Sequence, residues 1–216
     1  MSVAAPRTAH GPTADTEEPT GPVSVRLLGW VLAVGGAVGL LAAFTLTVEK
    51  IALLKDPSYT PSCSINPVLS CGSVMTTPQA EVFGFPNPLL GIAGFAVVTA
   101  IGVVLLSGAV LPRWFWWGLQ AGITFGVVLV HWLIFQSLYR IDALCPYCMV
   151  VWTVMIPVFW YTTVHTLTRR VLPVPARLRG AISVVAGYHG VVLTVWYLLI
   201  VTLIAQRFWL YWTSLI

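Results

Sequence analysis

Charged residues are scarce in this chain, and their scarcity excludes most water-soluble folds. Only 8% of the residues are Asp, Glu, Lys or Arg, 58% are hydrophobic, and the mean hydropathy is +0.89. A soluble domain needs more polar surface than this composition provides, so the chain is predicted to reside in a membrane. The eleven basic residues form no Lys/Arg-rich block interleaved with aromatic residues, and we therefore expect no nucleic-acid partner.

Cysteine is also rare, and the four cysteines fall into two pairs. Cys63 and Cys71 lie eight residues apart in a polar segment. Cys145 and Cys148 are the first and last residues of a Cys-Pro-Tyr-Cys run at the start of a long apolar segment. Thiols gathered in this way favour electron exchange. An inert structural pair is the alternative, because a bridge of this kind also stabilises a fold.

Two metal-dependent alternatives are disfavoured by the residues around the cysteines. Met149 follows the second cysteine of the Cys-Pro-Tyr-Cys run, where haem attachment requires histidine. The spacing between Cys63 and Cys71 is longer than the short knuckle typical of a four-cysteine zinc site. We therefore expect no bound metal.

Long apolar runs predict an all-α membrane protein with five transmembrane helices. Each run is long enough to cross the hydrocarbon layer, which takes about 20 helical residues. The runs cover residues 27–48, 88–111, 114–138, 144–167 and 182–205. Before them, residues 1–24 are rich in Pro, Thr, Ala and Glu without apolar periodicity, which predicts a disordered tail.

The distribution of basic residues predicts the orientation in the membrane. With a cytoplasmic N-terminus, seven basic residues fall on the cytoplasmic side and four on the other side. The cytoplasmic seven are Arg7, Arg26, Arg113, Arg169, Arg170, Arg177 and Arg179, and the remaining four are Lys50, Lys55, Arg140 and Arg207. The loop 49–86 and the turn 139–144 then share the extracytoplasmic face, where disulfides persist, and both cysteine pairs lie on that side.

The Cys-Pro-Tyr-Cys run has the chemistry of a reactive thiol pair. At a helix start, Cys145 lies near free amide N–H groups and the positive end of the helix dipole, which favour the thiolate. Pro146 suits the first helical turn, where its missing N–H is not needed. Cys148 lies one turn deeper on the same face, so the two sulfurs can join or separate with little backbone movement.

Glycines at four-residue spacing predict close helix packing. Gly35 and Gly39 lie in the first apolar run, and Gly118, Gly122 and Gly126 lie in the third. Small residues at this spacing let helix backbones approach each other in a membrane.

The cysteine spacing and its surroundings resemble the vitamin K epoxide reductase family in its bacterial form. The resemblance covers about residues 26–170. It rests on the Cys63 to Cys71 segment, Thr77, the Phe-Gly-Phe-Pro-Asn run of residues 83–87, Gly91 and the Cys145 to Cys148 run. It implies a four-helix bundle around a quinone within residues 25–170, with the redox loop 49–86 outside the cytoplasm. Residues 171–216 then add a cytoplasmic Arg-rich loop, a fifth transmembrane helix and a short tail.

The resemblance also implies a function, namely a membrane thiol:quinone oxidoreductase that supports disulfide bond formation in other proteins. A reduced thioredoxin-fold partner attacks Cys63, the released Cys71 attacks Cys145, and Cys148 passes the electron pair to the quinone. Only eleven residues follow Ala205, so we expect a separate DsbA-like partner rather than a fused domain. The Ala-, Val-, Gly- and Trp-rich composition is compatible with menaquinone as the acceptor, with ubiquinone as the alternative.

Three further residues match the quinone site of the family. Asn87 corresponds to its quinone-contacting asparagine, although an asparagine here can also cap the following helix. Thr77 falls where the family has a supporting Ser or Thr, and ordinary loop chemistry is the alternative. Trp152, four residues after Cys148, replaces a tyrosine of several members and offers a bulkier indole N–H.

Two other classes of function compete with this interpretation. A transporter or channel subunit needs charge or broken helices at mid-membrane, and the apolar runs contain almost no ionisable groups. A structural membrane protein with two stapling disulfides would bind no quinone and would lose only stability without Cys148.

Overall fold

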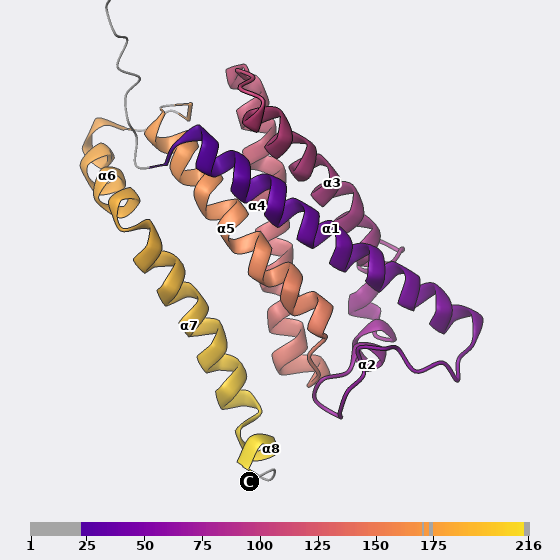
Figure 1. The fold of residues 1–216 in the computed structure, drawn as a ribbon. Helices are drawn as coiled ribbons and strands as arrows, with labels where there is room; N and C mark the ends of the chain where they lie inside the picture. The colour runs from indigo at the N-terminus through magenta and orange to yellow at the C-terminus, as the bar shows by residue number, and fades with distance from the viewer. Residues whose placement is uncertain (1–22, 170, 173–174, 214–216) are drawn as a thin grey trace, which may run out of the picture.

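The computed structural model describes residues 23–169, 171–172 and 175–213. In chain order these residues form α1 (Val25–Lys55), α2 (Cys71–Met75), η1 (Pro78–Glu81), α3 (Asn87–Leu106), α4 (Arg113–Gln136), the π-helix η2 (Ser137–Ile141), α5 (Pro146–Thr168), η3 (Ala176–Leu178), α6 (Arg179–Gly187), α7 (His189–Arg207) and α8 (Trp209–Thr213), as Figure 1 shows. No β-strand occurs within the described ranges. Residues 1–22 of the predicted tail lie outside them.

Five helices are long and apolar enough to cross a membrane, which confirms the prediction of an all-α membrane protein. They are α1, α3, α4 together with η2, α5 and α7. Their bounds differ from the predicted ones by five residues or more at three ends. Helix α3 ends at Leu106, five residues before the predicted end at residue 111. The first helix continues to Lys55 because its polar residues near the end bond to the following loop, and the fifth begins at His189 because residues 179–187 form the separate helix α6.

Helix α1 lies between α3 and α5 and packs closely against both (Figure 1). A Cβ atom added to Gly39 would lie 2.6 Å from the ring of Phe95 on α3. One added to Gly35 would lie 3.1 Å from Cγ2 of Val158 on α5. The predicted close approach at these two glycines is therefore confirmed.

Helix α4 packs against α5 but leaves a space between itself and α3. A Cβ atom added to Gly118 or Gly122 would have no neighbouring atom within 4 Å, so the prediction that these glycines bring helices together is wrong. Both line the space instead. Gly126, the third glycine of this series, lies against the side chain of Met155 on α5, with 2.7 Å from an added Cβ to the methionine Cε.

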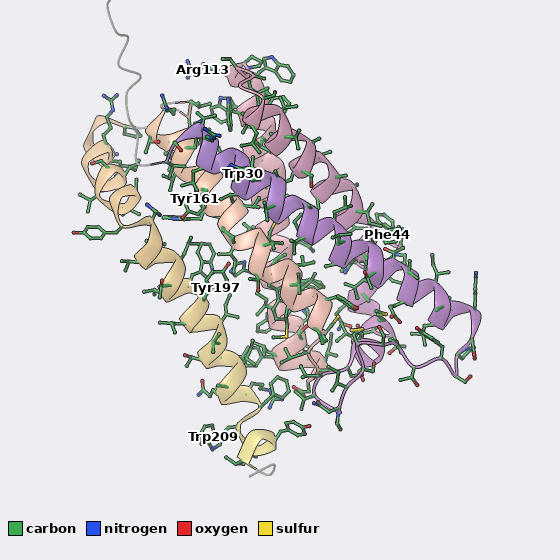
Figure 2. The ribbon with its side chains drawn as sticks, viewed as in Figure 1. Trp30, Phe44, Arg113, Tyr161, Tyr197 and Trp209 are labelled. Atoms are coloured by element: carbon green, nitrogen blue, oxygen red, sulfur yellow. A yellow bond between two sulfur atoms is a disulfide. The ribbon has the colours of Figure 1, made fainter. Side chains whose placement is uncertain are left out.

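Large apolar side chains cover the outside of the bundle, as expected of a surface in contact with lipid (Figure 2). Trp30 and Phe44 on α1 are each more than half exposed, at 54% and 57%. Helix α7 runs beside α5 at the edge of the bundle, and Ile200 is its one buried residue (Figure 1). The fifth helix therefore adds to the bundle from outside rather than completing its core.

Candidate active site

The structure brings the sulfurs of both cysteine pairs together at one end of the bundle. Cys63 and Cys71 form a disulfide, and Cys145 and Cys148 are free thiols. Only 3.1 Å separate Sγ of Cys71 from Sγ of Cys145, and both residues are fully buried. Cys148 is partly buried and packs against the same cluster.

Backbone hydrogen bonds between two distant segments explain this approach. Leu144 donates its N–H to the carbonyl of Val68 at 2.7 Å, and its own carbonyl accepts from the N–H of Ser70 at 2.9 Å. This short parallel bridge places the loop beside the segment that precedes α5. Cys71 follows Ser70 and Cys145 follows Leu144, so the bridge delivers the two sulfurs to one place.

Cys145 occupies the position that the sequence predicts, immediately before the first turn of α5. A hydrogen bond from Cys148 and the backbone N–H groups of Cys148 and Tyr147 lower the pKa of the Cys145 thiol, although burial opposes them. This direction agrees with the prediction that the helix start favours the thiolate. Pro146 is the first residue of the helix, also as predicted.

A buried carboxylate near the end of α1 holds the loop just before Cys63. Glu49 accepts hydrogen bonds from the hydroxyl of Tyr59 at 2.9 Å and from the hydroxyl and backbone N–H of Ser62. The hydrogen bond with Glu49 raises the pKa of the Tyr59 phenol. From the sequence, Glu49 is predicted only to belong to the polar loop 49–86. A charged residue directly after an apolar run is the signal that could have singled it out.

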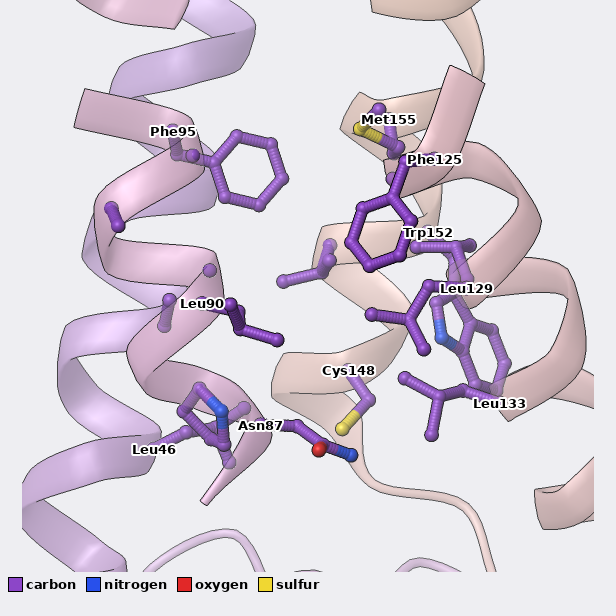
Figure 3. Close-up of a pocket in the computed structure, with 18 of the residues that line it drawn as sticks. Leu46, Asn87, Leu90, Phe95, Phe125, Leu129, Leu133, Cys148, Trp152 and Met155 are labelled. Carbon is purple, nitrogen blue, oxygen red and sulfur yellow. The ribbon is translucent and has the colours of Figure 1, made fainter. Parts of the chain in front are cut away.

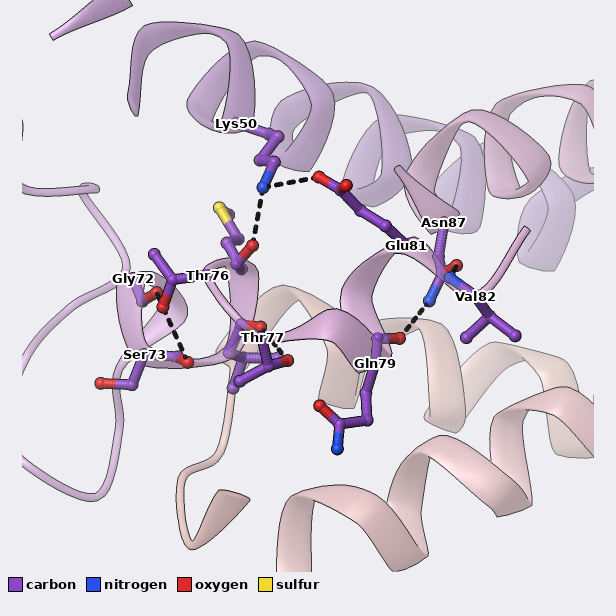
Figure 4. Close-up of polar contacts among 11 residues, drawn as sticks. Lys50, Gly72, Ser73, Thr76, Thr77, Gln79, Glu81, Val82 and Asn87 are labelled. Atoms are coloured by element: carbon purple, nitrogen blue, oxygen red, sulfur yellow. Dashed lines mark hydrogen bonds and ion pairs between the residues drawn. The ribbon is translucent and has the colours of Figure 1, made fainter. Parts of the chain in front are cut away.

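The next residue of α1 holds the segment that follows Cys71. The Nζ atom of Lys50 donates to the carbonyl of Met75 at 2.8 Å and forms an ion pair with Glu81 at 2.9 Å (Figure 4). Lys50 is buried, and it lines the space between α3 and α4. Adjacent residues of α1 thus hold both flanks of the disulfide loop, a role that sequence reasoning missed.

Asn87 closes the connection between η1 and α3. Its Nδ2 donates to the carbonyl of Gln79 at 2.8 Å, and its Oδ1 accepts from the N–H of Val82 at 3.1 Å (Figure 4). Both partners precede α3, so the alternative that the side chain caps this helix is wrong. One of the two N–H bonds of the amide nitrogen stays available, because the nitrogen carries two hydrogens.

Thr77 and Trp152 also lie where they can contribute to the site. The Thr77 hydroxyl donates to the carbonyl of Val74 at 2.8 Å, which fixes the turn between α2 and η1. Trp152 is 4% exposed, one turn beyond Cys148 on α5, and lines the same space. Figure 3 shows its indole beside Cys148, with Asn87 on the other side of that sulfur.

The space between α3 and α4 is a cavity of about 700 Å³, within the usual range for a small-molecule site. Most of its wall is apolar, with Leu90 and Phe95 on one side and Leu129 on the other (Figure 3). Polar side chains gather at the cysteine end, where Lys50, Thr77, Gln79, Asn87 and Ser137 line the wall. The cavity continues to Trp114 and Phe115 at the far end of α4, so it has room for an aromatic ring and an apolar tail.

Comparison with known proteins agrees with this geometry. Residues 30–163 match the model of the vitamin K epoxide reductase family, which is more than half of the chain. No curated protein matches the chain. The matched residues include both cysteine pairs, the bridge between their segments and the cavity wall at Asn87 and Trp152. The chain therefore belongs to the vitamin K epoxide reductase family of membrane thiol oxidoreductases that use quinones.

Proposed function

We propose that the protein oxidises a separate DsbA-like thioredoxin-fold protein on the extracytoplasmic side and passes the electrons to a membrane quinone. The distance of 3.1 Å between Sγ of Cys71 and Sγ of Cys145, a residue that lines the apolar cavity, supports this proposal most directly. Two sulfurs this close can exchange a disulfide with little backbone movement. A stapling role needs no such contact between the two pairs.

The relay consists of two dithiol–disulfide exchanges, each of which takes two steps. A partner thiolate attacks Cys63, forms a mixed disulfide and releases Cys71 as a thiolate, and the second partner thiol then restores the partner's own disulfide. The Cys71 thiolate attacks Cys145, which breaks the Cys145–Cys148 bond and releases the Cys148 thiolate. The Cys63 thiolate then attacks Cys71 and displaces Cys145. The loop disulfide forms again, and Cys145 and Cys148 remain as two thiols that hold the electron pair.

The disulfide pairing in the structure corresponds to the last state of this relay. The loop pair is joined and the other two thiols are free, as expected once the electrons have reached the pair beside the cavity. A bound quinone supplies an acceptor for two electrons and two protons, so the partner dithiol and the quinone yield a disulfide and a quinol. Menaquinone, with its two-ring head group, is the acceptor we propose.

The side chains around Cys148 suit a quinone head group. The remaining N–H of Asn87 can donate to a carbonyl oxygen, where negative charge develops during reduction. The buried indole of Trp152 offers a flat surface and an N–H on the opposite side. Thr77 acts indirectly, because its hydroxyl holds the turn that leads to Gln79, the partner of Asn87.

Entry of electrons requires the loop to open. Cys63 is only 5% exposed, so a partner sulfur reaches it only after the segment around Ser62 moves away from α1. Glu49 holds that segment through its hydrogen bonds to Tyr59 and Ser62, so the opening breaks these bonds and exposes Cys63 from its apolar cluster.

The decisive experiment measures quinone reduction by the purified protein with a reduced thioredoxin-fold partner and a short-chain menaquinone. We expect the wild type to reduce the quinone and Cys148→Ala to lose this activity. Val150→Ala, at an exposed position two residues further on, is the matched control. Undiminished activity in Cys148→Ala would contradict the relay, and no activity in either protein would favour the structural alternative.

A trapping experiment tests the roles of the loop cysteines. Cys71→Ala should accumulate a species linked to the partner through Cys63 on non-reducing gels, because the residue that resolves it is missing. Cys63→Ala should trap no partner. The reverse pattern would exchange the two roles.

A labelling experiment tests the orientation in the membrane. Single cysteines introduced at exposed Ile65 and at Arg113 are labelled from either face of the membrane, and we expect the two positions to react from opposite sides.

A further inference from the structure

Polar contacts fasten α7 to the bundle along its whole length. It packs against α5 and α6, and three hydrogen bonds link its side chains to α4 and α5 in an otherwise apolar setting. The pairs are Tyr161 with His189 at 3.2 Å, Trp196 Nε1 with His131 Nε2 at 2.9 Å, and Tyr197 with the carbonyl of Thr153. Interhelical hydrogen bonds of this kind favour helix association in a membrane.

The last residue of α7 makes the contacts closest to the cysteines. The Nε atom of Arg207 donates to the carbonyl of Leu138 at 2.8 Å, and Nη2 pairs with the carboxylate of Asp142. Leu138 belongs to the π-helix η2, and Asp142 ends it. The guanidinium therefore joins both ends of one short segment through two separate donors.

Asp142 has an uncommon backbone conformation. Its φ of 58° lies in the left-handed region, and no other non-glycine residue in the described ranges has a positive φ. Aspartate tolerates this region better than most residues, but the conformation still costs free energy and persists only where neighbouring contacts hold it. The ion pair with Arg207 is such a contact.

The turn at Asp142 sets the course of the chain into the redox site. Leu144, two residues later, forms the backbone bridge to Val68 and Ser70, and Cys145 follows it with its sulfur 3.1 Å from that of Cys71. A rotation of the turn would move Leu144 and Cys145 together. The bridge and the distance between the sulfurs thus depend on a conformation that α7 stabilises.

We propose that α7 braces the turn before the Cys-Pro-Tyr-Cys motif and that Arg207 is a positioning residue for the exchange between Cys71 and Cys145. The inference rests on the proposed function, because the exchange between Cys71 and Cys145 matters only in that relay. What it states of the structure is limited to how closely these two sulfurs approach. In that exchange the Cys71–Cys145 bond forms, the Cys145–Cys148 bond breaks, and Cys148 leaves as the thiolate. A displacement of about 1 Å at the attacking sulfur can slow such a step strongly.

The test measures the effective concentration of Cys71 toward Cys145 without quinone or partner protein. In full-length protein that carries Cys63→Ser and Cys148→Ser, glutathione disulfide oxidises the remaining thiols to the Cys71–Cys145 disulfide and yields two molecules of glutathione. The ratio of bridged to reduced protein across a series of glutathione mixtures gives the effective concentration. Arg207→Gln should lower it about three- to ten-fold, since a charge-assisted hydrogen bond and a partly exposed ion pair are lost.

Two further variants make the result specific. Tyr161→Phe removes the contact at the other end of α7, so it should lower the unfolding temperature and leave the effective concentration unchanged. Asp142→Asn keeps a residue that tolerates a positive φ but weakens the ion pair, so it should lower the value about two-fold and provides the test if Arg207→Gln does not fold.

Two results would overturn the proposed role of α7. One is an unchanged effective concentration in folded Arg207→Gln, and the other is an equal decrease of the effective concentration in Tyr161→Phe. Failure of the proposed function has a different signature. In that case the wild type would reduce no quinone, while Arg207→Gln would still show the lower effective concentration.

Discussion

The hydroxyl of Ser62 donates a hydrogen bond to the carboxylate of Glu49, and Ser62 immediately precedes Cys63. The buried end of α1 therefore holds the disulfide loop at the residue beside the sulfur that we expect a partner to attack. Glu49 is 7% exposed, so its carboxylate depends on Ser62 and Tyr59 for the hydrogen bonds that water would otherwise provide.

Glu49→Gln should make the loop disulfide easier to reduce. The neutral amide keeps the shape of the side chain but forms weaker hydrogen bonds, by about 1 kcal/mol, which raises the open population about five-fold. The measurement is the rate at which dithiothreitol reduces the Cys63–Cys71 disulfide. Lys55→Gln, at the exposed end of the same helix, should keep the wild-type rate, and equal rates in both variants would show that Glu49 does not hold the loop closed.

Lys50→Met should weaken both the fold and the quinone site. The change removes the hydrogen bond to Met75 and the ion pair with Glu81, with a loss of about 1–2 kcal/mol of unfolding free energy. The KM for a short-chain quinone should rise, because the released segment contains Gln79, which positions Asn87. Glu81→Gln retains the lysine and should show smaller changes. An unaltered KM in Lys50→Met would separate this residue from the quinone site.

Two glycines in different helices should respond in opposite ways to alanine. Gly122→Ala should stabilise the protein by about 0.5–1 kcal/mol, because the added Cβ meets open space and alanine favours the helix. Gly36→Ala should destabilise it by about 1–3 kcal/mol, because the added Cβ would lie 2.7 Å from the backbone nitrogen of Thr99. Thermal unfolding in detergent micelles measures both changes, and equal shifts would contradict the packing described above.

A bulkier change at the same cavity position tests the quinone site directly. Gly122→Leu places a side chain in the cavity, so the KM for quinone should rise at least about ten-fold while the protein remains folded. Gly94→Leu, across the cavity on α3, provides a second variant with open space around it. Normal KM values in both variants would place the acceptor elsewhere.

The Cys145 thiol should ionise at lower pH in the wild type than in Cys148→Ala. The hydrogen bond from Cys148 is the largest cause of the lowered pKa, so its loss moves the pKa toward the ordinary thiol value of about 8.5. Because the folded pKa is depressed, the thiolate adds stability above the unfolded pKa, and this contribution is lost as the pH falls through the folded pKa. Thiolate ultraviolet absorbance against pH, with the loop disulfide intact, measures the difference. Identical titrations would contradict the assigned cause.

Much of this protein follows from the sequence because the membrane restricts the possible structures. A chain with so little charge must satisfy its backbone within helices, so the apolar runs alone predict five membrane helices. The start of α5 is also local information, since Pro146 and the cysteines around it determine their own helical geometry. The spacing of the two cysteine pairs further predicted the family to which the chain belongs.

The contacts that assemble the site depend on residues far apart in the chain, which no local pattern encodes. The helical periodicity of Gly118 and Gly122 matches that of Gly35 and Gly39, yet only the tertiary structure shows that the first two line a cavity. Arg207 lies 65 residues after Asp142, and Cys71 lies 74 residues before Cys145. The positions of the membrane helices and the reactive residue types could be predicted from the sequence, because both depend on local chemistry. Which sulfurs, charges and glycines come into contact depends on how whole helices pack, so these contacts could be seen only in the folded protein.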